Sequence, residues 1–209
     1  MKKRRIYLIR HGETEFNRLG IFRGRYEVDL NEVGRQQASQ IGKALEGAGI
    51  EFLVTSPLTR AVETAEIIAS ALGIDYFKDE AFNNIALGEW QGVPKQKIKD
   101  EYPDLWHLWT TEPEKLAIPG GETVEDVRRR SFAGLKRILD DRKGTFAVVT
   151  HRSVIKALAA AMLDVNPPYF WKFYIDNAAF SVFEVTDAGY TLISWNNNAH
   201  LTEKVTEVF

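Results

Sequence analysis

The chain contains no cysteine, which excludes disulfide bonds, thiol nucleophiles and cysteine-based metal sites together. It also has little net charge. The 27 basic and 29 acidic side chains give −2 at pH 7, so a general nucleic-acid or anionic-membrane binder is not expected. Long apolar runs are missing too. The longest, 154–163, is interrupted by Lys156, and no segment could span a membrane or serve as a secretion signal. The absence of cysteine and of a secretion signal fits a cytoplasmic protein.

Two nucleotide-binding signatures are absent as well. The sequence has neither a Gly-x-x-x-x-Gly-Lys loop nor a Gly-x-Gly-x-x-Gly fingerprint, and its four histidines show no metal-binding spacing. We therefore expect no metal site and no binding of ATP or a dinucleotide.

Hydrophobic residues make up 44% of the 209 positions and charged residues 27%, which is typical of one globular domain. Apolar strand-like runs alternate with helical stripes, and this alternation predicts an α/β fold. We expect a three-layer sandwich with a mainly parallel central sheet, an antiparallel edge and helices on both faces. Strands are predicted at 6–9, 52–54, 74–77 and 146–149, with a closing hairpin at 179–185 and 190–195.

Helices are predicted at 31–45, from Ser56-Pro57 to Leu72, at 123–139 and at 153–163, with Asn31, Ser56 and Thr123 as N-caps. The segment from about 79 to 121 differs in composition, being rich in tryptophan and proline. It predicts short helices at 94–101 and 103–110 within a lid insertion of the single domain 1–209.

Chemistry-bearing residues follow three of the predicted buried strands. Arg10 and His11 come after the first strand, Arg60 lies in the first turn of the helix after the second, and His151 and Arg152 follow the 146–149 strand. Sites in open α/β sheets form where the strands end. Arginine forks pair with phosphate oxygens, and a neutral imidazole can attack phosphorus. A second, protonated imidazole can bind the charge that develops on the oxygens. The pattern favours a phosphoryl site.

Several blocks of the sequence then resemble the histidine phosphatase superfamily, the phosphoglycerate mutase-like proteins, nearly from end to end. The blocks are Leu8-Ile-Arg-His-Gly-Glu-Thr-Glu-Phe-Asn17, Gly24 with 29–31 and 34–38, 55–65, Gly88-Glu-Trp-Gln-Gly92, 120–123, 148–151, 176–178 and 199–201.

This resemblance implies that His11 is the nucleophile and forms a phosphohistidine, which water then hydrolyses. It also implies that no metal or organic cofactor is required. It implies that Arg10, Arg60 and His151 hold the phosphoryl oxygens, with Asn17 helping. Arg23, Gly24 and Arg152 are candidate substrate-binding residues. The expected partner is a small phosphorylated metabolite, and the exposed edge strand of the hairpin could support a homodimer.

The resemblance breaks at Asn84. The family usually has a glutamate here, four residues before the Gly-x-Trp-x-Gly block, which donates a proton to the leaving oxygen. An amide cannot act as a general acid, and such acids are worth about 10²–10⁴-fold in rate. Three explanations remain open: another carboxylate substitutes, with Glu13 and Glu89 nearest in sequence; the enzyme is slow or needs good leaving groups; or the protein binds phosphorylated ligands without turnover. A phosphoglycerate mutase is a further alternative, although mutases usually carry a longer insertion.

Three other residues have simpler interpretations. Arg152 either binds a second anionic group or faces solvent. His107, between Trp106 and Trp109, is predicted to be a packing residue, and His200 is predicted to be structural.

Overall fold

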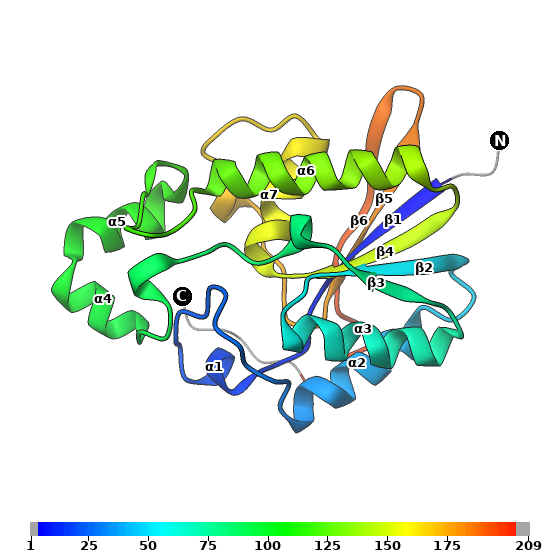
Figure 1. The fold of residues 1–209 in the computed structure, drawn as a ribbon, viewed down its shortest axis with the longest axis horizontal. Helices are drawn as coiled ribbons and strands as arrows, with labels where there is room; N and C mark the ends of the chain where they lie inside the picture. The colour runs from blue at the N-terminus through cyan, green and yellow to red at the C-terminus, as the bar shows by residue number, and fades with distance from the viewer. Residues whose placement is uncertain (1–3, 204–209) are drawn as a thin grey trace.

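A six-stranded mixed sheet forms the centre of the computed structural model, which describes residues 4–203 (Figure 1). Its strand order is β3-β2-β4-β1-β5-β6. The first four strands are parallel, whereas β5 is antiparallel to β1, and β6 to β5. The strands are β1 (Arg4–Arg10), β2 (Ile50–Thr55), β3 (Tyr76–Lys78), β4 (Thr145–Thr150), β5 (Phe180–Thr186) and β6 (Gly189–Asn197). The predicted α/β fold with an antiparallel edge is confirmed.

Helices cover both faces of this sheet, as Figure 1 shows. Helices α6 (Val124–Asp141) and α7 (Arg152–Met162) lie on one face, and α2 (Glu32–Ala44) and α3 (Thr59–Leu72) lie on the other. Alternate residues of β1 show why helices must cover both faces of the sheet. Ile6 and Leu8 pack in the core under α6 and α7, whereas Tyr7 and Ile9 pack in the core over α2 and α3. A strand that is apolar on both faces must be covered on both.

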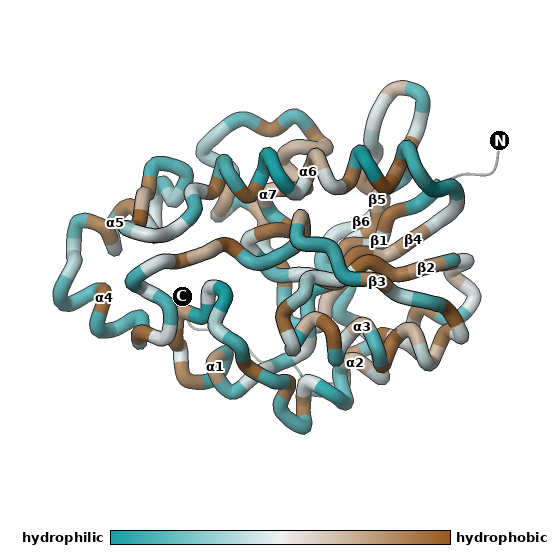
Figure 2. The backbone as a smooth tube through the Cα atoms, in the orientation of Figure 1, coloured by the Kyte–Doolittle hydropathy of each residue, from teal (hydrophilic) through white to brown (hydrophobic). Residues whose placement is uncertain are grey.

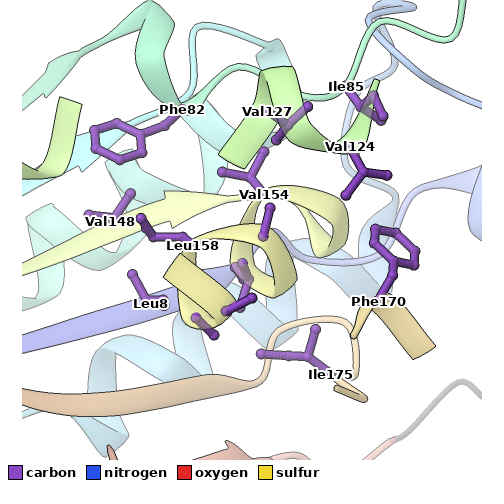
Figure 3. Packing of buried hydrophobic residues seen from close by; sticks show 14 of the residues in the cluster. Leu8, Phe82, Ile85, Val124, Val127, Val148, Val154, Leu158, Phe170 and Ile175 are labelled. Carbon is purple, nitrogen blue, oxygen red and sulfur yellow. The ribbon is translucent and has the colours of Figure 1, made fainter. Parts of the chain in front are cut away.

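The larger core lies between the sheet and α6 and α7. Figure 3 shows Leu8 and Val148 from neighbouring strands facing Leu158 of α7, with Phe82 packed beside them. Figure 2 shows the same arrangement as a hydropathy pattern, with brown segments along the strands and teal on the outer helix turns. Burial of these side chains is the main stabilising term for the fold.

The predicted helix starts are correct at two of three positions. The side chain of Asn31 accepts from the backbone N–H of Gly34, and Thr123 forms a capping box with Asp126. Ser56 was predicted to cap the third helix, which is wrong, since α3 begins at Thr59 after Leu58. Ser56 instead extends the sheet, and its N–H donates to the carbonyl of Val149 at 3.0 Å.

The insertion carries α4 (Lys95–Glu101) and α5 (Pro103–Thr111), close to the predicted bounds. Both helices lie at the end of the molecule toward which β1 runs (Figure 1). Trp90, Trp109 and Leu116 from this segment are buried in the same core as α6 and α7. The remaining short elements are α1 (Glu15–Arg18) and the 3₁₀ turns Glu80–Phe82, Gly88–Trp90, Pro113–Lys115 and Phe170–Lys172.

His107 was predicted to pack, and this is wrong. Trp109 on the same helix is 8% exposed and faces the core, whereas His107 is exposed on the other side of α5. His200 does have a structural contact, since its Nε2 lies 3.0 Å from the carbonyl oxygen of Ala178. Among residues 4–203, no helix is long and apolar enough to cross a membrane.

Candidate active site

The ends of β1, β2 and β4 bring two histidines and a serine together. Backbone pairing continues one residue past the ends of β1 and β2. The N–H of His11 donates to the carbonyl of Thr150, and the N–H of Ser56 donates to the carbonyl of Val149, both at 3.0 Å. The imidazole rings of His11 and His151 lie with their centroids 5.2 Å apart. The predicted convergence of distant residues at one sheet edge is therefore present.

His11 is fixed in one orientation by its own loop. Its Nδ1 lies 2.6 Å from the carbonyl oxygen of Gly12, so this nitrogen carries the proton and donates. Nε2 then holds the free electron pair that a nucleophile needs. Gly12 has no room for a side chain, because a Cβ there would lie 2.4 Å from the carbonyl oxygen of Gly34.

The surroundings of His11 keep its ring neutral. Burial, together with the guanidinium groups of Arg60, Arg23 and Arg10, holds the pKa of His11 well below its usual value. A neutral imidazole at physiological pH is the nucleophilic form.

His151 is held by the residue after β2. Its Nε2 lies 2.7 Å from Ser56 Oγ, and its buried Nδ1 has no hydrogen-bond partner among the described residues. Burial and the charge of Arg60 also hold the pKa of His151 well below its usual value. Burial and the neighbouring cations therefore disfavour a proton on His151. The protonated second imidazole expected in the transition state stays a prediction.

Two arginines are fully buried beside these rings. Arg10 donates from Nη1 to the carbonyl of Ile175 at 2.8 Å. Arg60 donates to the carbonyls of Tyr26 and Gly24, both at 2.9 Å. Burial and the charge of Arg23 lower the pKa of Arg60 to about 9, so it keeps its proton at neutral pH. Arg60 thus positions the loop around Gly24 and adds positive charge behind both histidines.

A cavity of about 60 Å³ opens at this edge. Most of the predicted site residues line it, whereas Arg60 and Asn17 do not. The lining residues are Arg10, His11, Ile21, Phe22, Arg23, Gly24, Asn84, Ile85, Leu87, Lys95, Trp109, His151, Arg152, Ser153 and Phe170. Arg152 is therefore a cavity residue, and its guanidinium also lies 5.9 Å from the centroid of the Trp171 ring.

Asn17 lies behind the loop that carries His11. Its Oδ1 accepts from the N–H and the hydroxyl of Thr14, and its Nδ2 donates to Asn177 at 3.2 Å. These bonds close the turn after β1. Asn17 therefore holds the loop that carries His11 in place. Its predicted help with the phosphoryl group stays a prediction.

Asn84 lines the cavity and has both ends of its side-chain amide engaged. Nδ2 donates to the carbonyl of Gly24 at 2.8 Å, and Oδ1 accepts from Ser153 Oγ at 2.7 Å. Its backbone carbonyl accepts from Arg25 and Arg130, both at 3.0 Å, and both arginines are held by Glu122. Position 84 is therefore rigidly placed at the cavity wall.

Neither carboxylate suggested as a replacement acid lines the cavity. Glu13 is buried and its Oε1 accepts from Asn31 at 2.7 Å, which ties it to the start of α2. Glu89 is exposed and lines a different hollow, beside Trp90.

The sequence reasoning missed several cavity residues. Ser153 follows His151 by two positions, so the turn into α7 was a usable signal. Lys95 and Trp109 belong to the insertion at 79–121, whose tryptophans were expected to form a lid over the pocket, but neither residue was singled out. Phe170 lies before β5, in a segment that no strand-end argument reaches.

Comparison with known proteins agrees with this arrangement. A family model described as histidine phosphatase superfamily (branch 1) matches residues 6–198. Phosphoserine phosphatase 1 of Hydrogenobacter thermophilus is 30% identical over 95% of this chain and 95% of its own. Phosphoglycerate mutase-like protein 4 of Arabidopsis thaliana is 32% identical, covering 95% of this chain and 87% of its own.

Solved structures extend the similarity to the backbone. YhfR of Bacillus stearothermophilus has a TM-score of 0.89 and 31% identity, over 94% of this chain and 98% of its own. A mycobacterial glucosyl-3-phosphoglycerate phosphatase, solved as a complex with VO3, has a TM-score of 0.87 and 26% identity, over 93% and 100%. With a family match over nearly the whole chain, the chain belongs to the histidine phosphatase superfamily, branch 1.

Proposed function

We propose that the chain hydrolyses small phosphate monoesters through a phosphohistidine on Nε2 of His11. In the first step, the Nε2 electron pair forms a bond to phosphorus and the bond from phosphorus to the ester oxygen breaks. In the second, water attacks phosphorus, the N–P bond breaks and inorganic phosphate leaves. Each step transfers one phosphoryl group, and neither requires a redox partner.

One observation carries this proposal: a neutral, oriented imidazole faces a second imidazole 5.2 Å away, within a cluster of buried guanidinium groups. The charge of Arg10, Arg23 and Arg60 favours a phosphoryl dianion and the charge spread of a loose transition state. The N–H groups at the start of α7, which begins directly after His151, add donors.

The names of the relatives support a phosphatase. Two are phosphatases of small phosphorylated metabolites, one acting on phosphoserine and one on glucosyl-3-phosphoglycerate. The mycobacterial enzyme also binds VO3, an analogue of the transferring group. We extend this substrate size to the present chain. A cytoplasmic location and a homodimer through the edge strand β6 stay predictions.

Rapid mixing with phosphate-labelled substrate tests the proposal. We expect acid-labile phosphate on His11 and release of inorganic phosphate, both lost in His11→Gln and kept in the control His107→Gln on the surface of α5. Label that moves to another hydroxyl of the product would indicate a mutase. Binding of substrate without label on His11 would refute turnover and leave a phospho-ligand binding protein.

A further inference from the structure

The cavity wall has an unusual charge composition for a site that must release an alkoxide. Among the described residues that line it there is no aspartate or glutamate, and the charged side chains are the cations Arg10, Arg23, Lys95 and Arg152. Arginine and lysine hold their protons far more tightly than a carboxylic acid does. They stabilise a departing anion by charge, but they are poor proton donors to it.

The remaining polar groups of the wall do not replace the missing acid. The amide of Asn84 is occupied by Gly24 and Ser153, and the Ser153 hydroxyl proton is used in that bond. Burial holds the pKa of His151 well below its usual value, so its ring is neutral, and its Nε2 lies 2.7 Å from Ser56 Oγ. The leaving oxygen therefore meets positive charge and no carboxylic acid among the described residues.

A second part of the cavity lining is apolar and aromatic. Phe22, Trp109 and Phe170 all line the cavity, and their rings touch in sequence, with centroids 5.3 Å apart for Phe22–Trp109 and 5.9 Å for Trp109–Phe170. The side chains of Ile85 and Leu87 extend this wall. Flat apolar groups pack well against such rings, since aromatic pairs contribute beyond the area they bury.

We propose that the site selects phosphate monoesters whose leaving group is an acidic hydroxyl on a flat apolar ring, that is, aryl phosphates. This inference rests on the proposed function and adds the substrate class to it. His11 Nε2 bonds to phosphorus, the P–O bond breaks, and its electron pair departs on a phenolate. The phenolate needs no proton to leave and takes one from water afterwards. The aromatic wall holds the ring, and the cations of the wall stabilise the oxygen anion.

A substrate series tests the leaving-group part on the unmodified protein. 4-Nitrophenyl, phenyl and benzyl phosphate all carry a ring, but the acidity of their alcohols falls in that order. We expect kcat/KM to fall along the series, with benzyl phosphate at least about 10²-fold below 4-nitrophenyl phosphate, the range in which general acids act. A difference of less than about tenfold would show that an acid operates and would overturn this part.

Two variants at one position then test the cause. Asn84→Glu restores the carboxyl, and Asn84→Gln has the same length without an ionisable proton. We expect the ratio of kcat/KM for benzyl phosphate to that for 4-nitrophenyl phosphate to rise about 10²-fold in Asn84→Glu and not in Asn84→Gln. An equal rise in both variants would overturn the inference. Should neither variant fold, the substrate series on the wild type decides alone.

Phosphonates, which are not hydrolysed, isolate the recognition of the ring. Phenylphosphonate should inhibit at least about tenfold more tightly than methylphosphonate, because burial of apolar ring surface contributes about 25 cal/mol per Å². Equal inhibition would overturn the aryl part. If the proposed function itself were wrong, neither aryl nor alkyl phosphates would leave labelled phosphate on His11, and that result differs from each outcome above.

Discussion

In phosphate-free buffer, lowering the pH from 7 to 5 should destabilise the protein through two buried imidazoles. Burial and the surrounding guanidinium groups hold the pKa values of His11 and His151 well below the ordinary value. The unfolded chain therefore takes up two protons near pH 6.5 that the native state does not. When the unfolded state binds more protons, stability rises with pH, so it is lost as the pH falls below that value.

The size of this loss follows from the same linkage. Each histidine contributes up to about 1.4 kcal/mol for every pH unit well below 6.5, and integration from pH 7 to 5 gives at most about 2 kcal/mol for a ring that stays neutral throughout. Both rings together give at most about 4 kcal/mol, which for a domain of this size corresponds to a Tm lowered by at most about 8–16 °C.

Urea unfolding at pH 7, 6 and 5 measures this directly, with two matched comparisons. His11→Gln should remove about half of the pH dependence, and the same measurement on the surface variant His107→Gln is the matched control. Saturating inorganic phosphate should reduce the loss, since a bound anion favours the protonated rings. An unchanged free energy of unfolding between pH 7 and 5, or equal slopes in wild type and His11→Gln, would refute the electrostatic reasoning.

Three further predictions follow from the site and the core. 4-Nitrophenyl phosphate should give a burst of about one 4-nitrophenolate per enzyme before slower turnover. The reason is that the acid missing from the first step would also serve as the base that activates water in the second step. Stopped-flow absorbance measures the burst, and a linear trace from the start would contradict it. Gly12→Ala should lower kcat/KM by at least about 10²-fold. The new Cβ would lie 2.4 Å from the carbonyl oxygen of Gly34, so the loop that carries His11 must shift. An unchanged kcat/KM in steady-state assays would count against this prediction. Phe82→Ala should cost about 3–5 kcal/mol in urea unfolding, because Phe82 is fully buried in the larger core, and a cost below 1 kcal/mol would show that the cavity collapses.

The strand-end residues were predictable because their positions follow from local sequence and one rule of sheet geometry. Apolar runs of three or four residues identify β1, β2 and β4, and parallel strands place His11, Ser56 and His151 at one edge. The start of α3 was not predictable in the same way. Ser56-Pro57 has the local signature of a helix cap, but pairing with Val149 holds Ser56 in the sheet.

The cavity walls were less predictable for a physical reason. Trp109 and Phe170 reach the site through packing between segments that are far apart in the chain, and no local pattern encodes that meeting. The low pKa of His151 was not predictable either, because it depends on burial in the folded chain and on the guanidinium groups of Arg60, Arg23 and Arg10. The Asn84 side chain could be located by motif spacing, whereas its bonds to Gly24 and Ser153 required the folded loops.

The cation-rich wall has a consequence for the end of each catalytic cycle. The same guanidinium groups that attract a phosphate ester also attract the inorganic phosphate that remains after hydrolysis, because both are anions with at least three non-bridging oxygens. Product departure is then opposed by the forces that bring the substrate in. Inorganic phosphate should therefore compete with the substrate for the cavity and slow the reaction as its concentration rises.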